Sequence, residues 1–188
     1  MTDDFNNLTL QELGNLFPII IADYDSDWQK LFLHEKQNIL KAVDINDIRR
    51  IEHIGSTAIP GLCAKPTIDI LIEISDKTNC DFFINNLQKI QYQYIPKPDN
   101  PPPHIMLAKG YSKTGLIGQT FHIHVRYGGD WEEIIFRDYL IRNPETAKQY
   151  GDLKRQLSIM FKNDREKYTD SKTDFIKLTT QLARNHRH

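Results

Sequence analysis

Cysteine, long apolar runs and net charge are all scarce in this 188-residue chain. Its two cysteines, Cys63 and Cys80, form no metal motif, so we expect reduced thiols in a cytoplasmic protein. No apolar run reaches the roughly 18 residues of a membrane-spanning helix, so we expect no membrane partner. The formal net charge of −1 argues against a general nucleic-acid or membrane-surface binder.

Several common enzyme signatures are also missing. The sequence contains no P-loop, no dinucleotide-binding glycine fingerprint and no serine-hydrolase elbow. The N-terminal segment MTDDFNN is acidic and polar, which is wrong for a signal peptide. Hydrophobic residues make up 39% of the chain and charged residues 26%, a balance typical of globular proteins.

The stretch 53–74, HIGSTAIPGLCAKPTIDILIEI, carries the clearest functional pattern. It predicts a strand that ends at Gly55, where the missing Cβ lets the backbone turn sharply or approach a ligand. The hydroxyl and backbone N–H groups of Ser56 and Thr57 can then face an anion. Lys65 follows closely enough to neutralise a phosphate. We therefore predict an anion site at this turn.

The second strand of this stretch, 67–74, is apolar except for two acids. Because side chains alternate along a strand, its isoleucines share one face, while Asp69, Leu71 and Glu73 share the other. An aspartate in so apolar a run costs desolvation energy unless something pairs with it. Glu73 lies about 13 Å farther along an extended strand, so we interpret it as a rim or surface residue.

The remaining pattern mixes strands and helices first and then turns purely helical. It predicts an α+β fold, in which a mixed β-sheet is flanked by helices and the C-terminal third is helical. We expect a single domain, 1–188, with a nucleus of strands and helices at about 17–128 and helices packed on it at about 129–188. A Pro-rich segment at 96–103 is interpreted as a spacer rather than a lid. The predicted strands are 17–24 at a sheet edge, 49–54, 67–74, 91–95, 104–111 and 119–127, and the predicted helices are a short one before 17, then 26–43, 76–90, 130–142, 144–160 and 171–184.

The predicted strand 119–127 offers a second set of polar side chains. His122, His124 and Arg126 alternate with apolar residues and therefore share one face, with about 6.6 Å between successive members. If this strand lies beside Asp69, an acid, two imidazoles and a guanidinium converge. Imidazole and carboxylate ligands suit zinc, manganese or iron, whereas magnesium prefers oxygen. Asp69, His122 and His124 are thus candidate catalytic and metal-binding residues.

Each of these residues also has a purely structural interpretation. Asp69 can cap a turn or pair with Arg126, and the two histidines can lie on a solvated sheet face. Lys154 and Lys172 on the C-terminal helices are interpreted mainly as exposed lysines, with a contact to phosphate or acceptor as the alternative.

Several blocks of the chain together resemble one family. The stretch 53–74 looks like the signature of the GrpB family, which is similar to the nucleotidyltransferase superfamily. The resemblance covers roughly 19–184, through the helix start at 24–28 and the blocks GQTFHIHVRYGG, FRDYLIRNPETAKQYGDLKRQL and REKYTDSKTDFI. It implies a small mixed sheet with a Gly-Ser turn that holds nucleotide phosphates, here Gly55 and Ser56.

The resemblance also implies a divalent metal, Mg²⁺, while the histidine ligands considered above make Mn²⁺ or Zn²⁺ the alternatives. The superfamily holds it with an acidic pair and often a third acid from a later strand. In this sequence Asp69 matches the first acid, Leu71 occupies the second position, and His122 or His124 replaces the third. One carboxylate makes a poor magnesium cage, so either the metal differs or the activity has changed.

Three functions fit these residues. The first is a nucleotidyltransferase-like enzyme that binds a nucleotide and transfers a nucleotidyl group to a small acceptor. The second is a nucleotide- or phosphate-binding module that has lost catalysis, and the third is a His-dependent metal phosphoesterase. Lys65 and Arg126 would neutralise phosphate in the first of these.

Overall fold

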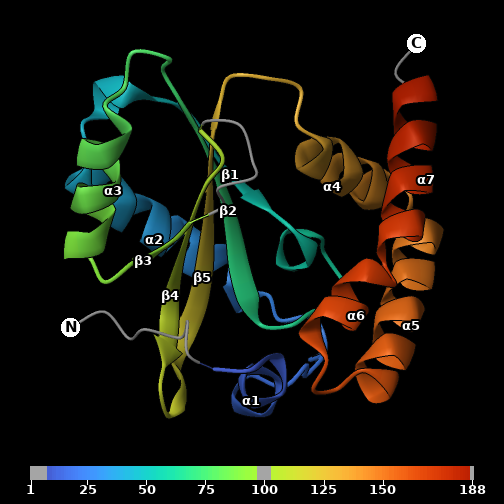
Figure 1. Ribbon diagram of the computed structural model, residues 1–188. Helices are drawn as coiled ribbons and strands as arrows, with labels where there is room; N and C mark the ends of the chain where they lie inside the picture. The colour runs from blue at the N-terminus through green and yellow to red at the C-terminus, as the bar shows by residue number, and fades with distance from the viewer. Residues whose placement is uncertain (1–7, 97–102, 187–188) are drawn as a thin grey trace.

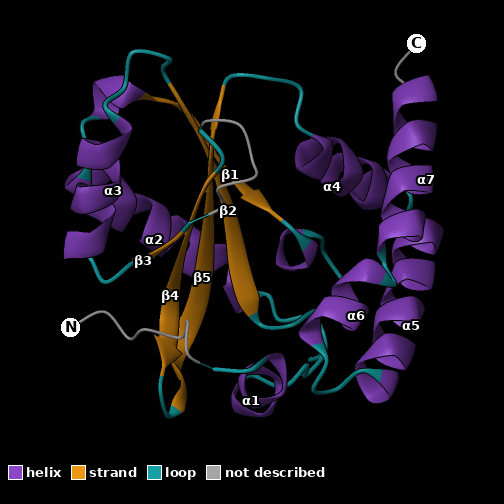
Figure 2. Ribbon diagram, viewed as in Figure 1, coloured by secondary structure: helices purple, strands orange, loops and turns teal. Residues whose placement is uncertain are grey.

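The computed structural model describes residues 8–96 and 103–186, which form a five-stranded mixed sheet with helices on both faces (Figures 1 and 2). The strand order is β1-β2-β5-β4-β3; β2 and β5 run parallel, and the other neighbouring pairs are antiparallel. The predicted α+β fold is confirmed. The strands are β1 Ile48–Ile54, β2 Thr67–Ile74, β3 Gln93–Ile95, β4 Ile105–Ser112 and β5 Gly115–Tyr127.

The helices divide between the two faces of the sheet (Figure 1). Helices α2 (Asp27–Ala42) and α3 (Cys80–Lys89) cover one face. The C-terminal helices lie on the other side, as the predicted helical third requires. They are α4 Glu132–Arg142, α5 Pro144–Met160, α6 Arg165–Asp170 and α7 Thr173–Asn185; the remaining helices are α1 Leu10–Leu16 and the short 3-10 helices η1 Ile45–Asp47 and η2 Ser56–Ala58.

The main hydrophobic core lies between the sheet and helices α2 and α3. The four isoleucines of β2 are 0% exposed and face this core, as their alternation predicts. Their neighbours Asp69, Leu71 and Glu73 therefore project from the opposite face, toward the C-terminal helices. The helix residues that pack against the isoleucines include Trp28, Phe32, Ile39, Phe83 and Leu87.

Leu71 is fully buried on that opposite face. It packs with Ile54 of β1 and Ile134 of α4 in a small apolar cluster. A carboxylate at this position would be desolvated among apolar side chains. The position at which the resemblance leads us to expect a second acid is thus occupied by a residue that attaches α4 to the sheet.

Two predicted segments differ in the structure or lie outside it. The edge strand expected at 17–24 is wrong, because this segment makes only an isolated bridge between Ala22 and Ala64. Most of the Pro-rich segment 96–103, interpreted as a spacer, lies outside the described residues. Within residues 8–96 and 103–186, no helix is long and apolar enough to cross a membrane.

Two helices start later than predicted. Helix α3 begins at Cys80 rather than near 76, because the Asn79 side chain accepts a hydrogen bond from the Phe82 N–H at 3.0 Å and caps the helix there. Helix α7 begins at Thr173, and the separate short helix α6 was not predicted. The division of the chain into a core and C-terminal helices near 128 stays a prediction.

Candidate functional site

The turn after β1 brings the backbone close to Asp69. Gly55 has φ +71° and ψ −172°, a conformation that only glycine adopts readily. A Cβ at this position would lie 2.5 Å from Asp69 Oδ2. Gly55 is therefore required both by its backbone conformation and by the close approach of the carboxylate.

Replacing Gly55 by alanine is expected to lower the free energy of unfolding by about 2 to 4 kcal/mol, because backbone strain and a clash with Asp69 add together. Urea denaturation measures the loss. Gly61→Ala is the matched control, since Gly61 has φ +77° but nothing within 4 Å of a Cβ. Equal losses in the two variants would contradict the role assigned to the Asp69 contact.

The hydroxyl of Thr57 supports the turn from inside. Thr57 is buried, donates to the Thr67 carbonyl at 3.2 Å and contacts His53 Nε2 at 3.0 Å. Burial lowers the pKa of His53 to about 4, so this imidazole is neutral at pH 7. The Thr57 hydroxyl thus bonds within the scaffold, while the residue lines the pocket described below, and its predicted anion contact stays a prediction.

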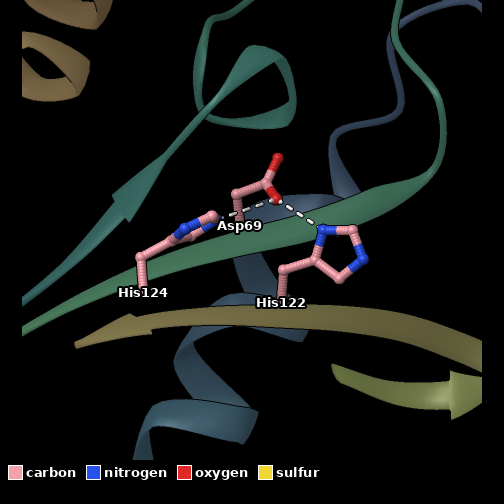
Figure 3. Close-up of side chains that lie close together, drawn as sticks. All are labelled: Asp69, His122 and His124. Carbon is pink, nitrogen blue, oxygen red and sulfur yellow. Dashed lines mark hydrogen bonds and ion pairs between the residues drawn. The ribbon is translucent and has the colours of Figure 1, made fainter. Parts of the chain in front are cut away.

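Asp69, His122 and His124 form the centre of the site (Figure 3). Both imidazoles approach the same carboxylate oxygen, Oδ1: His122 Nδ1 lies at 3.1 Å and His124 Nε2 at 3.7 Å. One potential ligand atom from each residue lies within 4.8 Å of the others. Ligands bonded to one transition-metal ion at about 2.0 to 2.2 Å lie about 3 to 3.5 Å apart, so small rotations of these side chains would accommodate an ion.

The parallel register of β2 and β5 creates this cluster. Asp69 is paired with His122, and Leu71 is paired with His124. His124 thus lies next to the position from which the superfamily's second acid would project, and its ring still reaches Asp69. The sequence predicted that these three residues would converge if the strands were neighbours, and the structure brings them together.

Hydrogen bonds determine the state of Asp69 and orient His122. Burial opposes ionisation of Asp69, but the hydrogen bond from His122 and the nearby imidazole of His124 hold its pKa well below the ordinary range. The other nitrogen of His122, Nε2, lies 2.8 Å from the Tyr111 hydroxyl, and the two rings stack. Such a second partner fixes the ring of a metal-binding histidine. Tyr111 was not singled out from the sequence.

Three lysines from separate parts of the chain meet in a pocket of about 200 Å³ beside this cluster. Lys65 precedes β2, Lys154 belongs to α5, and Lys172 precedes α7. Asp69 is the only carboxylate among the lining residues, so the pocket carries an excess of positive charge. The other lining residues are Gly55, Ser56, Thr57, Thr67, His122, Tyr150 and Tyr168.

Burial and mutual repulsion weaken the charge on these lysines. Burial lowers the pKa of Lys154 to about 7 and the pKa values of Lys65 and Lys172 to about 8; nearby cations add to this, Arg165 for Lys65 and Lys65 for Lys172. Tyrosine rings compensate in part. Lys172 Nζ lies 4.1 Å from the centroid of Tyr168, and Lys154 Nζ lies 4.8 Å from that of Tyr150. The lining of the pocket therefore keeps three buried or half-buried amines beside one carboxylate.

The interpretation of Lys154 as an exposed lysine is wrong. Its side chain is 2% exposed, and its ammonium donates to the Cys63 carbonyl. Tyr150 and Tyr168 were not predicted as site residues. The signal was present for Tyr150, which lies four residues before Lys154 and thus on the same helix face, but the apolar periodicity of α5 assigned it to the core.

Two other predicted polar residues lie away from this pocket. Glu73 was interpreted as a rim or surface residue, but it is 6% exposed and pairs with Arg50. Arg126 does not line the pocket; it is buried farther along β5, against the ring of Trp131. A phosphate in the lysine pocket would therefore not reach Arg126.

The five-stranded mixed sheet, the turn at Gly55 and Ser56 and the acid projecting beside it define a mixed α+β protein with one polar site on the face that the C-terminal helices cover. More specifically, the chain belongs to the GrpB family, because the model of the family "GrpB protein" matches residues 18–182.

Similar proteins and a solved structure support the assignment to this family. The chain is 33% identical over 162 residues to "Glutamate-rich protein GrpB" of Alkalihalophilus pseudofirmus, covering 84% of this chain and 91% of the relative. It is 33% identical to "UPF0157 protein YqkA" of Bacillus subtilis, covering 93% of this chain but 51% of that protein. The crystal structure of conserved protein GrpB from Enterococcus faecalis has a TM-score of 0.77 and 29% identity, covering 90% of this chain and all of that one.

A more distant match is to a protein that is named as an enzyme. "Dephospho-CoA kinase" of Mycolicibacterium paratuberculosis is 23% identical, over 92% of this chain and 47% of that protein. The chain therefore corresponds to less than half of that kinase.

Proposed function

We propose that this protein binds a nucleoside triphosphate by its phosphates, together with one divalent cation, and transfers the nucleotidyl group to a small acceptor. The observation that carries the proposal is the position of the lysine pocket directly beside the Asp69–His122–His124 cluster. Asp69 and His122 belong to both. A phosphate chain in the pocket would therefore end next to the cation.

The lysine pocket supports the phosphate-binding part. Three lysines and Ser56 line a pocket that has a single carboxylate among its lining residues, an excess of positive charge that a polyanion would balance. Bound phosphates favour the charged form of each lysine and so reverse the lowering of its pKa. The match to part of a dephospho-CoA kinase fits nucleotide binding only in general terms.

The donor set of the cluster supports a transition-metal ion over magnesium. Asp69 offers oxygen, and His122 and His124 offer two imidazole nitrogens, which suit Mn²⁺ or Zn²⁺ better than Mg²⁺. A bound cation would neutralise charge on the phosphate oxygens. Tyr111 would keep the His122 ring in place.

The proposed reaction is a substitution at the α-phosphorus of the nucleotide. A bond forms between the acceptor oxygen and phosphorus, and the bond to the β-phosphate oxygen breaks. Pyrophosphate leaves, and the proton of the acceptor hydroxyl passes to solvent. The lysines would bind the phosphates that depart, while Ser56 and the turn at Gly55 hold the end nearest Asp69.

Thermal unfolding with a panel of nucleoside triphosphates, each with Mn²⁺, Zn²⁺, Mg²⁺ or EDTA, tests the proposal. A ligand that binds only the folded state adds about 2.7 kcal/mol of stability at 100 times its dissociation constant. We expect a shift that needs both nucleotide and metal, together with pyrophosphate release once an acceptor is supplied.

Other outcomes identify the alternatives. A nucleotide shift that EDTA does not change, without pyrophosphate, would show a binding module. Metal-dependent release of inorganic phosphate from phosphate esters would show a phosphoesterase. No shift with any triphosphate would exclude the proposed substrate.

A further inference from the structure

Arg126 is a buried cation without a neutralising partner among the described residues. Its side chain is 8% exposed, its Nη1 donates to the Val125 carbonyl at 2.9 Å, and its Nε has no hydrogen-bond partner. Within residues 8–96 and 103–186, no carboxylate lies within ion-pair distance of it. A guanidinium stays charged at neutral pH, so this arrangement is costly unless an anion binds there.

The neighbouring charges do not remove this imbalance. Glu73 is paired with Arg126 in the register of β2 and β5, but its carboxylate is bound to Arg50. At this level of the sheet the Glu73 carboxylate therefore pairs with Arg50 and not with Arg126. Glu133 of α4 acts on Arg126 only as a more distant charge. Among the described residues, the positive charge of the Arg126 guanidinium is therefore not balanced by a carboxylate in contact with it.

The position of Arg126 relates it to the proposed metal centre. It lies on the same face of β5 as His122 and His124, about 6.6 Å beyond His124 along the strand. The lysine pocket lies at the other end of the cluster, near Thr67. The Asp69–His122–His124 cluster is thus flanked by two separate cationic sites.

An aromatic surface accompanies this second site. The ring centroid of Trp131 lies 5.9 Å from the Arg126 guanidinium carbon, and His104 meets the Trp131 ring edge-on at 6.3 Å. Trp131 is held by a hydrogen bond from its indole N–H to the Tyr127 carbonyl at 3.1 Å. Charge and a planar apolar surface therefore occur together.

We propose that Arg126 and Trp131 form the acceptor subsite and that the acceptor carries a carboxylate or phosphate group. The anion would bind Arg126 and any planar part would lie against Trp131. The acceptor oxygen would then point back toward the Asp69–His122–His124 cluster. This assignment rests on the proposed function, because an acceptor is defined only if a nucleotide occupies the lysine pocket.

Fluorescence of Trp131 tests the subsite without a known acceptor. The chain has two tryptophans, so Trp28→Phe leaves Trp131 as the sole reporter. In this background, titration with inorganic phosphate and separately with acetate is expected to give a saturable change for at least one anion. Arg126→Gln is expected to weaken that response about tenfold or more, and Arg126→Lys less, since a hydrogen bond to a charged group is stronger than one between neutral groups. The anion that responds identifies the chemical group.

Controls separate this proposal from the nucleotide site. Arg142→Gln removes an exposed arginine of α4 and should leave the response unchanged. Circular dichroism checks that each variant folds. A response unaltered in Arg126→Gln, or no response to either anion, would overturn the subsite. The triphosphate–metal thermal shift of the unsubstituted chain is scored separately, so failure of the nucleotide proposal is recognised even when the Trp131 response is present.

Discussion

Asp69→Asn is expected to abolish metal-dependent nucleotide binding and any turnover. Asparagine keeps the shape of the side chain but removes the only carboxylate of the cluster, so the cation would lose its one anionic ligand. Loss of an outer partner of a metal ligand already costs about 10- to 100-fold in affinity, so loss of the ligand itself should cost more. Calorimetric titration with Mn²⁺ and Zn²⁺, with and without triphosphate, measures the effect.

Asp81→Asn is the matched control, because Asp81 is an exposed residue of α3 on the opposite face of the sheet. It should bind metal and nucleotide like the unsubstituted chain. Undiminished metal affinity in Asp69→Asn would show that Asp69 serves only to pair with His122 and His124.

Lys154→Met is expected to weaken triphosphate binding by about 10- to 100-fold, since a hydrogen bond between charged groups contributes about 1.5 to 3 kcal/mol. The same change should raise the melting temperature of the ligand-free protein by a few degrees, because it replaces a buried ammonium with an apolar side chain of similar length. Calorimetry measures the first effect and thermal unfolding the second. Lys148→Met, at an exposed position of the same helix, should change neither.

The pH dependence of stability gives Lys154 a second readout. Its pKa is about 7 in the folded protein, whereas in the unfolded chain it has the ordinary value of 10.5. Between about pH 7 and pH 10.5 the unfolded chain therefore binds more protons at this group than the folded protein does. The free energy of unfolding contributed by this group therefore rises with pH across this window. The rise should be smaller in Lys154→Met. An identical pH profile in both proteins would contradict the burial of a titrating ammonium.

The Asp69–His122–His124 cluster was largely predictable from the sequence. Alternation along two strands determines which side chains share a face, and this local rule placed Asp69 on one strand and both histidines on another. The pairing of β2 with β5 brought them together. The sequence predicted that these side chains meet only if the two strands are neighbours, because a sequence pattern does not specify which strands pair.

The lysine pocket was not predictable in the same way. Lys154 and Lys172 lie far along the chain from Lys65, and their helical patterns are those of ordinary amphipathic helices, which usually expose lysine. Only the packing of α5, α6 and α7 against the site face of the sheet turns these side chains inward. Glu73 shows the same limit, since its burial depends on Arg50 from a neighbouring strand.

The sequence by itself thus determined the α+β class, the Gly-Ser turn and the face on which each strand residue lies, because these follow from local backbone geometry and side-chain alternation. The tertiary structure decided the rest. Packing of Leu71 against α4 excluded a second acid, helix docking gathered the lysines, and the Arg50–Glu73 pair left Arg126 without a partner among the described residues. These outcomes depend on contacts between distant segments, whose energies no local pattern contains.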